Sequence, residues 1–497
     1  MRRDSFVGQV IRYLGRAEPP FQAQAPVVPR RRFDHVLRAA LAFQPHRRLR
    51  PGDDLHGADL SNGDLAHTDL TGADLRGAVL TGADMSHANL RRANLTRCSA
   101  SDEAVGIPLA MRGTGSVDLS MAVLSEAALN DAILPRANLR QAKLNGADIK
   151  GTLLTQANLV NADLSGASLR RADLRGAQLS GARLTDADLG GAQLSVHRGA
   201  SRSSSGPCYS SDLFSPAPGA TNLRDTDLTR ANLEEADLVS ADLGAADLTE
   251  ACLVRARLNR ANLQDANLTG ADLRGAGVSG AHLRGANLTG ATLPAPQQLS
   301  QAHLAGVIMP GADLVGISLP GVDLSKADLS GANLSEADLK SAKLASTRLQ
   351  GAELRDADLS KSDLSNSALS EANLLNADLN GANLEHVDLS RGQLSGANLS
   401  KASLKSANLQ RAQLDGSDLR GADLSHADVR SASLRGANLI RANLSHTRLF
   451  GARWTLGTKW PTAIYPAIMT RSVEVEPGEW EIRGDGAAER TQAPSSV

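Results

Sequence analysis

The sequence predicts an all-β protein built as a parallel β-helix with four-sided coils. Three observations predict this fold: a five-residue phrase repeated along most of the 497 residues, an aromatic content of only 2%, and the concentration of the aromatic residues near the two chain ends. In the phrase A-(D/N)-L-x-x, for example ADLSGANLSEADL over 327–339, leucine returns at every fifth position. The middle of the chain must therefore build its core from leucine and alanine.

A spacing of five fits neither regular secondary structure. On an α-helix five residues advance by about 500°, so successive leucines would point to every side. On a straight strand an odd spacing puts successive leucines on opposite faces. If the chain turns by about 90° after each phrase, four phrases close a coil of about 20 residues with every leucine inside.

Each position of the phrase then has a predicted place. Side chains two apart in a strand share a face, so the alanine two residues before each leucine also points inward. The Asp or Asn between them faces outward or accepts hydrogen bonds from neighbouring backbone amides, as short Asx side chains do in turns. The last two residues form the corner. One coil cannot offset its loss of conformational entropy alone, so the coils must stack as parallel strands.

The chain resembles the pentapeptide repeat family of bacterial type. The resemblance rests on about 70 matching phrases between Leu55 and Leu449, and on the Trp-Pro-containing ending WTLGTKWPTAIYPAIM over 454–469. It implies a right-handed quadrilateral β-helix. Stacked without a break, about 18 coils at ~4.8 Å would form a rod of roughly 85 Å.

Shifts in the leucine register divide the chain into segments. We predict a basic arm with a helical cap over 1–50, and over 453–497 a Trp-containing cap whose tail is frayed beyond about 472. Repeat arrays are predicted over 51–95, 119–194, 223–293 and 294–452, separated by a distorted coil with a loop over 96–118 and a flexible insertion rich in Ser, Gly and Pro over 195–222.

Three segments carry further structural predictions. FDHVLRAALAF over 33–43 has apolar residues at helical spacing and would cover the first leucine layer. In 96–118, Val105 and Leu109 suggest coil, whereas Glu103 and Arg112 stand where small inward residues are expected. After PAPQQ over 294–298, the inward position holds Val or Ile and two corners hold Pro, which predicts a wider or bent coil.

Composition excludes several classes of protein. The net charge is −1, but residues 1–50 carry 11 Lys and Arg against 3 Asp and Glu, so a basic arm precedes a mildly acidic body. The three cysteines lie far apart, with no disulfide framework or zinc motif. No apolar run approaches the ~18 residues of a membrane span. A reducing, cytoplasmic location is expected.

The repeats carry no catalytic motif, so we predict no enzyme activity, no cofactor and no metal site. An Asp recurring at one structural position is explained by the fold. His67 and His87 share a corner position 20 residues apart, and the histidines at 386, 426 and 446 share one at multiples of 20, but no carboxylate or cysteine completes a ligand set. We interpret them as solvated corner residues.

Three features are candidate interaction sites. In the fourth array, every twentieth residue gives a column of Asp and Asn with several cations nearby, which favours neutralisation within the surface. The arm could remain solvated or contact nucleic acid, anionic lipid or an acidic protein, and the insertion offers two aromatic side chains. The candidate residues are Asp338, Asp358, Asp378 and Asp418 in the column, Arg30, Arg31, Arg32, Arg47, Arg48 and Arg50 in the arm, and Tyr209 and Phe214 in the insertion.

The leading functional hypothesis is a rigid scaffold that binds another protein. The alternative comes from the resemblance: one branch of the family mimics the shape and charge of DNA, binds DNA gyrase or topoisomerase IV and protects against quinolones. This chain is longer and nearly neutral over its repeats, which disfavours the alternative. Nucleic-acid binding by the repeats is not expected, because no basic groove or aromatic row is present. An enzyme would need a cleft within 96–117 or 294–322.

Overall fold

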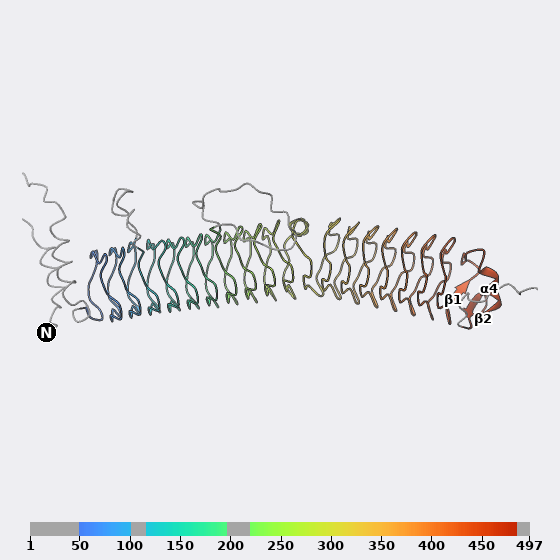
Figure 1. The fold of residues 1–497 in the computed structure, drawn as a ribbon, viewed down its shortest axis with the longest axis horizontal. Coiled ribbons are helices and arrows are strands. Elements are labelled where there is room, and N and C mark those ends of the chain that lie inside the picture. Colours follow the sequence, from blue (N-terminus) through green and yellow to red (C-terminus); the bar gives the residue numbers. More distant parts are fainter. Residues whose placement is uncertain (1–48, 101–115, 196–218, 485–497) are drawn as a thin grey trace, which may run out of the picture. The chain divides into compact units, whose positions relative to one another are not determined.

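The predicted coils are present in the structure, a computed structural model that describes residues 49–100, 116–195 and 219–484 (Figure 1). Outside one short helix, α3 (Pro296–Leu299), and the C-terminal cap, the described chain repeats a bridge residue followed by a two-residue turn. Parallel bridges such as Asp54 to Asp74 and Asp338 to Asp358 join residues 20 positions apart. Four phrases therefore make one coil.

The coils form two compact units. The first contains the described residues up to Asn267 together with Ala271–Val278, and the second contains Leu268–Gly270 together with the described residues from Ser279 onward. Each unit has a core of leucine and alanine. Leu119 and Ala122 in the first unit, and Leu329 and Ala332 in the second, have no exposed surface.

The phrase around Asp328 shows why these residues form a coil. The Leu329 amide donates to Arg348 in the next coil at 2.8 Å, while the Ala332 amide donates to the Leu329 carbonyl at 3.0 Å and closes the turn. The Asp328 carboxylate accepts the Ser330 amide at 3.1 Å. The prediction that Asp binds turn amides is thus confirmed. Gly331, at the corner, has the left-handed φ of +65° that this type of turn requires.

Polar residues at the inward position bind carbonyl groups of the coil. Thr347 donates its hydroxyl to the Leu324 carbonyl at 2.9 Å, and Ser362 donates to Leu359 at 2.6 Å. These bonds remove the cost of burying a hydroxyl in an apolar core. Val307 and Ile317, which occupy the same position after α3, are fully buried. The wider or bent coil expected there stays a prediction.

Both gaps in the described chain open at the same corner of the first unit. The chain leaves the coils just after Ser99 and again after Gln193, and bridges connect these two residues through the 133, 153 and 173 positions of one column. It re-enters just before Asp118 and Asn222, which belong to the next column. We call this edge, between the Ser99–Gln193 and Asp118–Asn222 columns, the insertion corner.

The described residues next to the gaps belong to regular coils. Cys98 is buried and Ser99 forms a bridge, so the coil pattern continues to the end of 96–100. The pattern resumes by Val117. The residues Val105, Leu109, Glu103 and Arg112, and the helical cap predicted over 33–43, lie outside the described residues.

A small mixed cap follows the last coil. It contains β1 (Arg453–Thr455), α4 (Tyr465–Thr470), β2 (Ser472–Glu476) and β3 (Glu479–Ile482), with both outer strands antiparallel to β3. Trp454 is fully buried against Trp460 and Trp480, and its Nε1 donates to Ser472 at 3.0 Å.

The prediction of a frayed tail beyond about 472 is wrong for residues 472–484. Two strands form there because β1 offers an edge for β3, with Trp454 paired to Trp480. The Gly451 amide also donates to Ile482 at 2.7 Å, which joins the sheet to the last coil.

Candidate interaction surfaces

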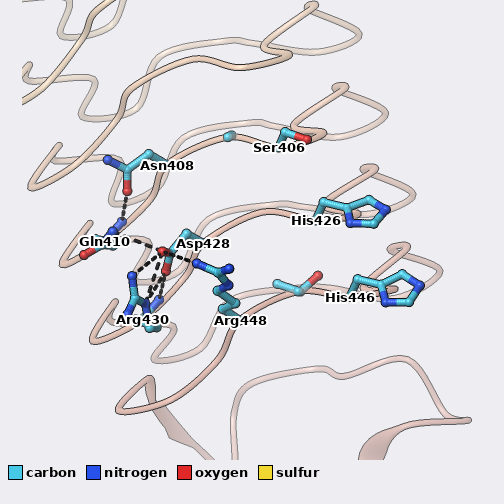
Figure 2. A pocket seen from close by; sticks show the side chains of 10 residues that line it. Ser406, Asn408, Gln410, His426, Asp428, Arg430, His446 and Arg448 are labelled. Atoms are coloured by element: carbon cyan, nitrogen blue, oxygen red, sulfur yellow. Dashed lines mark hydrogen bonds and ion pairs between the residues drawn. The ribbon is translucent and has the colours of Figure 1, made fainter. Parts of the chain in front are cut away.

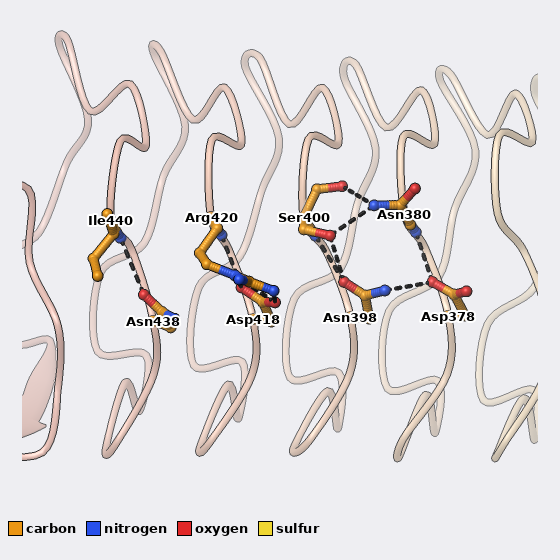
Figure 3. A network of polar contacts seen from close by, with 8 residues as sticks. All are labelled: Asp378, Asn380, Asn398, Ser400, Asp418, Arg420, Asn438 and Ile440. Carbon is orange, nitrogen blue, oxygen red and sulfur yellow. Dashed lines mark hydrogen bonds and ion pairs between the residues drawn. The ribbon is translucent and has the colours of Figure 1, made fainter.

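The column of Asp and Asn in the second unit is formed as the 20-residue register predicts. Parallel bridges join its six members in sequence, and we call it the aspartate column: Asp338, Asp358, Asp378, Asn398, Asp418 and Asn438. Figure 3 shows its C-terminal part. The Asn398 amide group donates to Asp378 at 2.8 Å, so an Asn between carboxylates links neighbouring coils.

Cations on the following corner positions outnumber the carboxylates of the aspartate column. The column contains four Asp residues and two Asn residues, and the turns that follow these six members contain five cations, namely Lys340, Lys361, Lys401, Arg420 and Arg441. Arg420 pairs with Asp418 at 2.6 Å. Within the described residues, no ion pair joins the other four cations to the column, and turn amides bind the remaining carboxylates, as the Ser360 amide binds Asp358. The face is therefore not acidic.

The Asp418 carboxyl illustrates the electrostatics of this face. The side-chain hydrogen bond from Arg420 lowers the pKa of Asp418 below its usual value, while partial burial acts in the opposite direction. The carboxylate remains ionised at neutral pH, and its charge is balanced two residues away. A large cationic partner would have to compete with Arg420 for it.

The other sequence candidates lie mainly outside the described residues. Arg50 is exposed at the start of the first coil, and its backbone amide donates to Asp53 at 2.8 Å. The remaining candidates lie outside the described residues: Arg30, Arg31, Arg32, Arg47, Arg48, Tyr209 and Phe214.

A pocket of about 760 Å³ lies along one corner of the second unit. Figure 2 shows His426 and His446 on one side and Asp428, Arg430 and Arg448 on the other. The two imidazole rings stack with centroids 4.8 Å apart. The sequence analysis found the corner position shared by the histidines but did not predict that Asp428, Arg430 and Arg448 face them. The 20-residue register could have shown that residues 428 and 448 lie in one column.

Asp428 is the most strongly bound group in this pocket. Arg430 contacts it at 2.6 Å, the Gln410 side chain donates to it at 3.0 Å, and Arg448 approaches to 3.8 Å. Partial burial raises the pKa of Asp428, but the hydrogen bonds from Arg430 outweigh it and hold the pKa below the usual value. An ionised carboxylate occupied by three donors is poorly suited to proton transfer at neutral pH.

Metal-ligand clusters and membrane-spanning helices are both absent from the described residues. In residues 49–100, 116–195 and 219–484, no group of three or more His, Cys, Asp or Glu side chains could hold a metal ion. In the same residues, no helix is long and apolar enough to cross a membrane.

Comparison with known proteins identifies the repeats. The family described as pentapeptide repeats matches residues 58–97, 122–195, 220–290 and 298–453 in overlapping copies, which is more than half of the chain. The chain belongs to the pentapeptide repeat family. Proteins of this family fold as right-handed quadrilateral β-helices, in agreement with the parallel bridges of both units. None of the curated proteins matches this pentapeptide repeat protein.

Solved structures similar to this pentapeptide repeat protein cover only part of it. HetL, involved in heterocyst differentiation regulation in the cyanobacterium Nostoc sp. strain PCC 7120, is 34% identical over 55% of this chain and 95% of its own, with a TM-score of 0.28. Rfr23 from the cyanobacterium Cyanothece 51142 is 40% identical over 20% of this chain and 63% of its own (TM-score 0.12). The plasmid-mediated fluoroquinolone resistance protein QnrB1 is 17% identical over 50% of this chain and 92% of its own, with a TM-score of 0.28.

Proposed function

We propose that this pentapeptide repeat protein is a non-enzymatic scaffold that binds a protein partner beside the insertion corner. The observation that carries the proposal is the opening of both inserted segments at this one corner. Four coil steps separate Ser99 from Gln193, which at ~4.8 Å per step is roughly 19 Å. A standard interface of about 800 Å² per partner is wide enough to cover both openings.

The column beside the insertion corner has a composition that suits a protein partner. Between the two openings its three outward positions hold Ile133, Leu153 and Asp173, so two of the three are apolar where other columns hold mainly Asp and Asn. Leu153 is 40% exposed. Apolar side chains within a polar surround are typical of the centre of a protein interface. Stacked coils hold such a surface rigidly, which limits the entropy lost on binding.

The proposal is tested by affinity capture with chemical crosslinking on the full chain. Two variants replace 101–115 or 196–218 with a short Gly-Ser linker, and a third carries Leu153→Glu. The control is Lys143→Glu, two columns away from Leu153. We expect one crosslinked partner that all three variants lose and the control retains. Retention of the same partners by all variants would place binding elsewhere and contradict the proposal.

The structure does not favour the alternative, a DNA-mimicking protein that binds gyrase or topoisomerase IV. Such a protein needs a continuous acidic face, whereas four Asp of the aspartate column are accompanied by five cations. We therefore expect no change in gyrase supercoiling at micromolar concentrations of the full chain. Inhibition or protection of gyrase that survives Leu153→Glu would support the alternative over the scaffold.

A further inference from the structure

Two histidines and a methionine occupy consecutive positions along one corner of the first unit. His67 and His87 stand at the left-handed corner position of adjacent coils, with ring centroids 4.6 Å apart and planes inclined by 13°. Met121 holds the same position in the next coil, because the His87 amide donates to the carbonyl of Ser120 at 2.8 Å. We call His67, His87 and Met121 the His–His–Met row.

Met121 is an unusual residue for this position. Its side chain is 45% exposed, and no other left-handed corner in the described residues holds an exposed large hydrophobic side chain. Elsewhere in the described residues this position holds glycine, which adopts a positive φ without steric cost, or a polar or charged residue, apart from Ala245. Packing of the coil thus gives no reason for a thioether at this exposed corner, one coil away from His87.

We propose that the His–His–Met row binds monovalent copper. Imidazole is a good ligand for copper, and soft thioether sulfur selects Cu(I) over harder cations. Imidazole nitrogens bind first-row metals at about 2.0–2.1 Å, as they do zinc, through lone pairs that lie in the ring plane. The His67 and His87 rings are stacked, so at least one of them must rotate about its side-chain torsions to turn a nitrogen toward a shared ion. Both side chains are exposed, which permits this rotation.

The charge around the row favours a cation. An aspartate precedes each member by three residues, and bridges join these residues in one column: Asp64, Asp84 and Asp118. Hydrogen bonds from Ser86 lower the pKa of Asp84, and the charges of the two histidines contribute. No three His, Cys, Asp or Glu groups in the described residues are placed to hold a metal. The carboxylates therefore attract the ion through charge, and the third ligand is the thioether.

A second histidine pair provides a matched control within the chain. His426 and His446 occupy the same corner position in the second unit, with rings 4.8 Å apart and nearly parallel at 9°. In the coil before His426 the same corner position holds Ser406. Arg430 and Arg448 line the same pocket as the two histidines. This pair lacks the thioether and lies beside cations, so its affinity for Cu(I) should be lower.

The affinity is measured by anaerobic titration of the full chain with Cu(I) against the competing chelator bicinchoninate. Cys208→Ser and Cys252→Ser remove the cysteines that could compete. Cys98 can stay, since burial raises the pKa of its thiol to about 12. We expect one tightly bound Cu(I). Met121→Leu and His87→Asn should each weaken binding by at least the 10–100-fold that loss of an outer-shell partner costs, while His426→Asn should leave it unchanged.

X-ray absorption provides a readout that a purely structural role would not alter. The copper-loaded chain should show a copper–sulfur distance of about 2.3 Å, as for other first-row metal–sulfur bonds, and Met121→Leu should lose it. Met121→Leu conserves side-chain volume at an exposed position, so circular dichroism should match the parent chain. Unchanged Cu(I) affinity in Met121→Leu, or an equal loss in His426→Asn, would overturn the proposal.

Discussion

At the scale of one residue, the repeat imposes a left-handed backbone on one corner residue of most phrases. Gly416 has φ +68° with no atom within 4 Å of an added Cβ, so Gly416→Ala meets no steric clash. Alanine there adds only the cost of the left-handed backbone, about 1–2 kcal/mol. We expect Gly416→Ala to lower the free energy of unfolding by about 1 kcal/mol, measured in urea by the fluorescence of the cap tryptophans. Gly416→Asn should lower the free energy of unfolding by less, because Asn tolerates the left-handed conformation better than Ala. An equal decrease for both variants would contradict the explanation by backbone conformation.

The sequence predicted the role of each position in the phrase because each position meets one physical demand. Leucine fills the core, alanine fits a narrow interior, and Asp binds the turn amides, as Asp328 does with Ser330. The His–His–Met row was not predicted. His87 and Met121 are 34 residues apart in sequence, since an inserted segment replaces the expected spacing of 20, and methionine is not counted when a sequence is searched for His, Cys and carboxylate ligands.

At the scale of an element, the C-terminal cap protects the last leucine layer and strand edge. Its sheet joins the final coil through Gly451 and Ile482, and Arg435 contacts the buried Glu479 at 2.7 Å. A chain ending at 452 would expose this edge to pairing with other chains. We expect it to aggregate in size-exclusion chromatography with light scattering. A chain ending at 484 keeps the cap and should match the full chain; a stable 1–452 chain that does not associate would exclude a protective role.

The strands at 472–484 could not be predicted from their own residues. SVEVE and EWEI are short and largely polar, and neither carries a five-residue period. These strands form because of contacts with residues distant in sequence. One is the hydrogen bond from the Arg435 side chain to Glu479, which lowers the pKa of Glu479. Tertiary contacts of this kind often override local propensity in strands.

At the scale of the whole chain, many of the outward carboxylates of the repeats are paired locally. In several repeats an arginine follows the outward aspartate by two residues and pairs with it at 2.5–2.6 Å. These pairs occur in both units and are Asp74–Arg76, Asp173–Arg175, Asp272–Arg274, Asp418–Arg420 and Asp428–Arg430. Exposed pairs stabilise little individually, but repeated pairing couples the stability of the whole chain to pH.

Acid should therefore destabilise this protein in two steps. Burial, followed by the charge of His303, lowers the pKa of His282, so the unfolded chain takes up a proton first as pH falls below about 6.5. Hydrogen bonds from their arginine partners lower the pKa values of Asp74, Asp272 and Asp418. Their stabilising effect is complete above the unfolded-state pKa of about 3.9 and is lost as pH falls through the lower folded-state values.

The two steps can be separated by measuring the unfolding temperature from pH 8 to pH 2. We expect a small decrease between about pH 6.5 and 5 and a larger one below about pH 4. His282→Asn should remove the first step and keep the second. Arg420→Gln should make the second step smaller, because Asp418 then titrates closer to its unfolded-state value. An unfolding temperature that stays constant down to pH 3 would show that these carboxylates do not depend on their arginine partners.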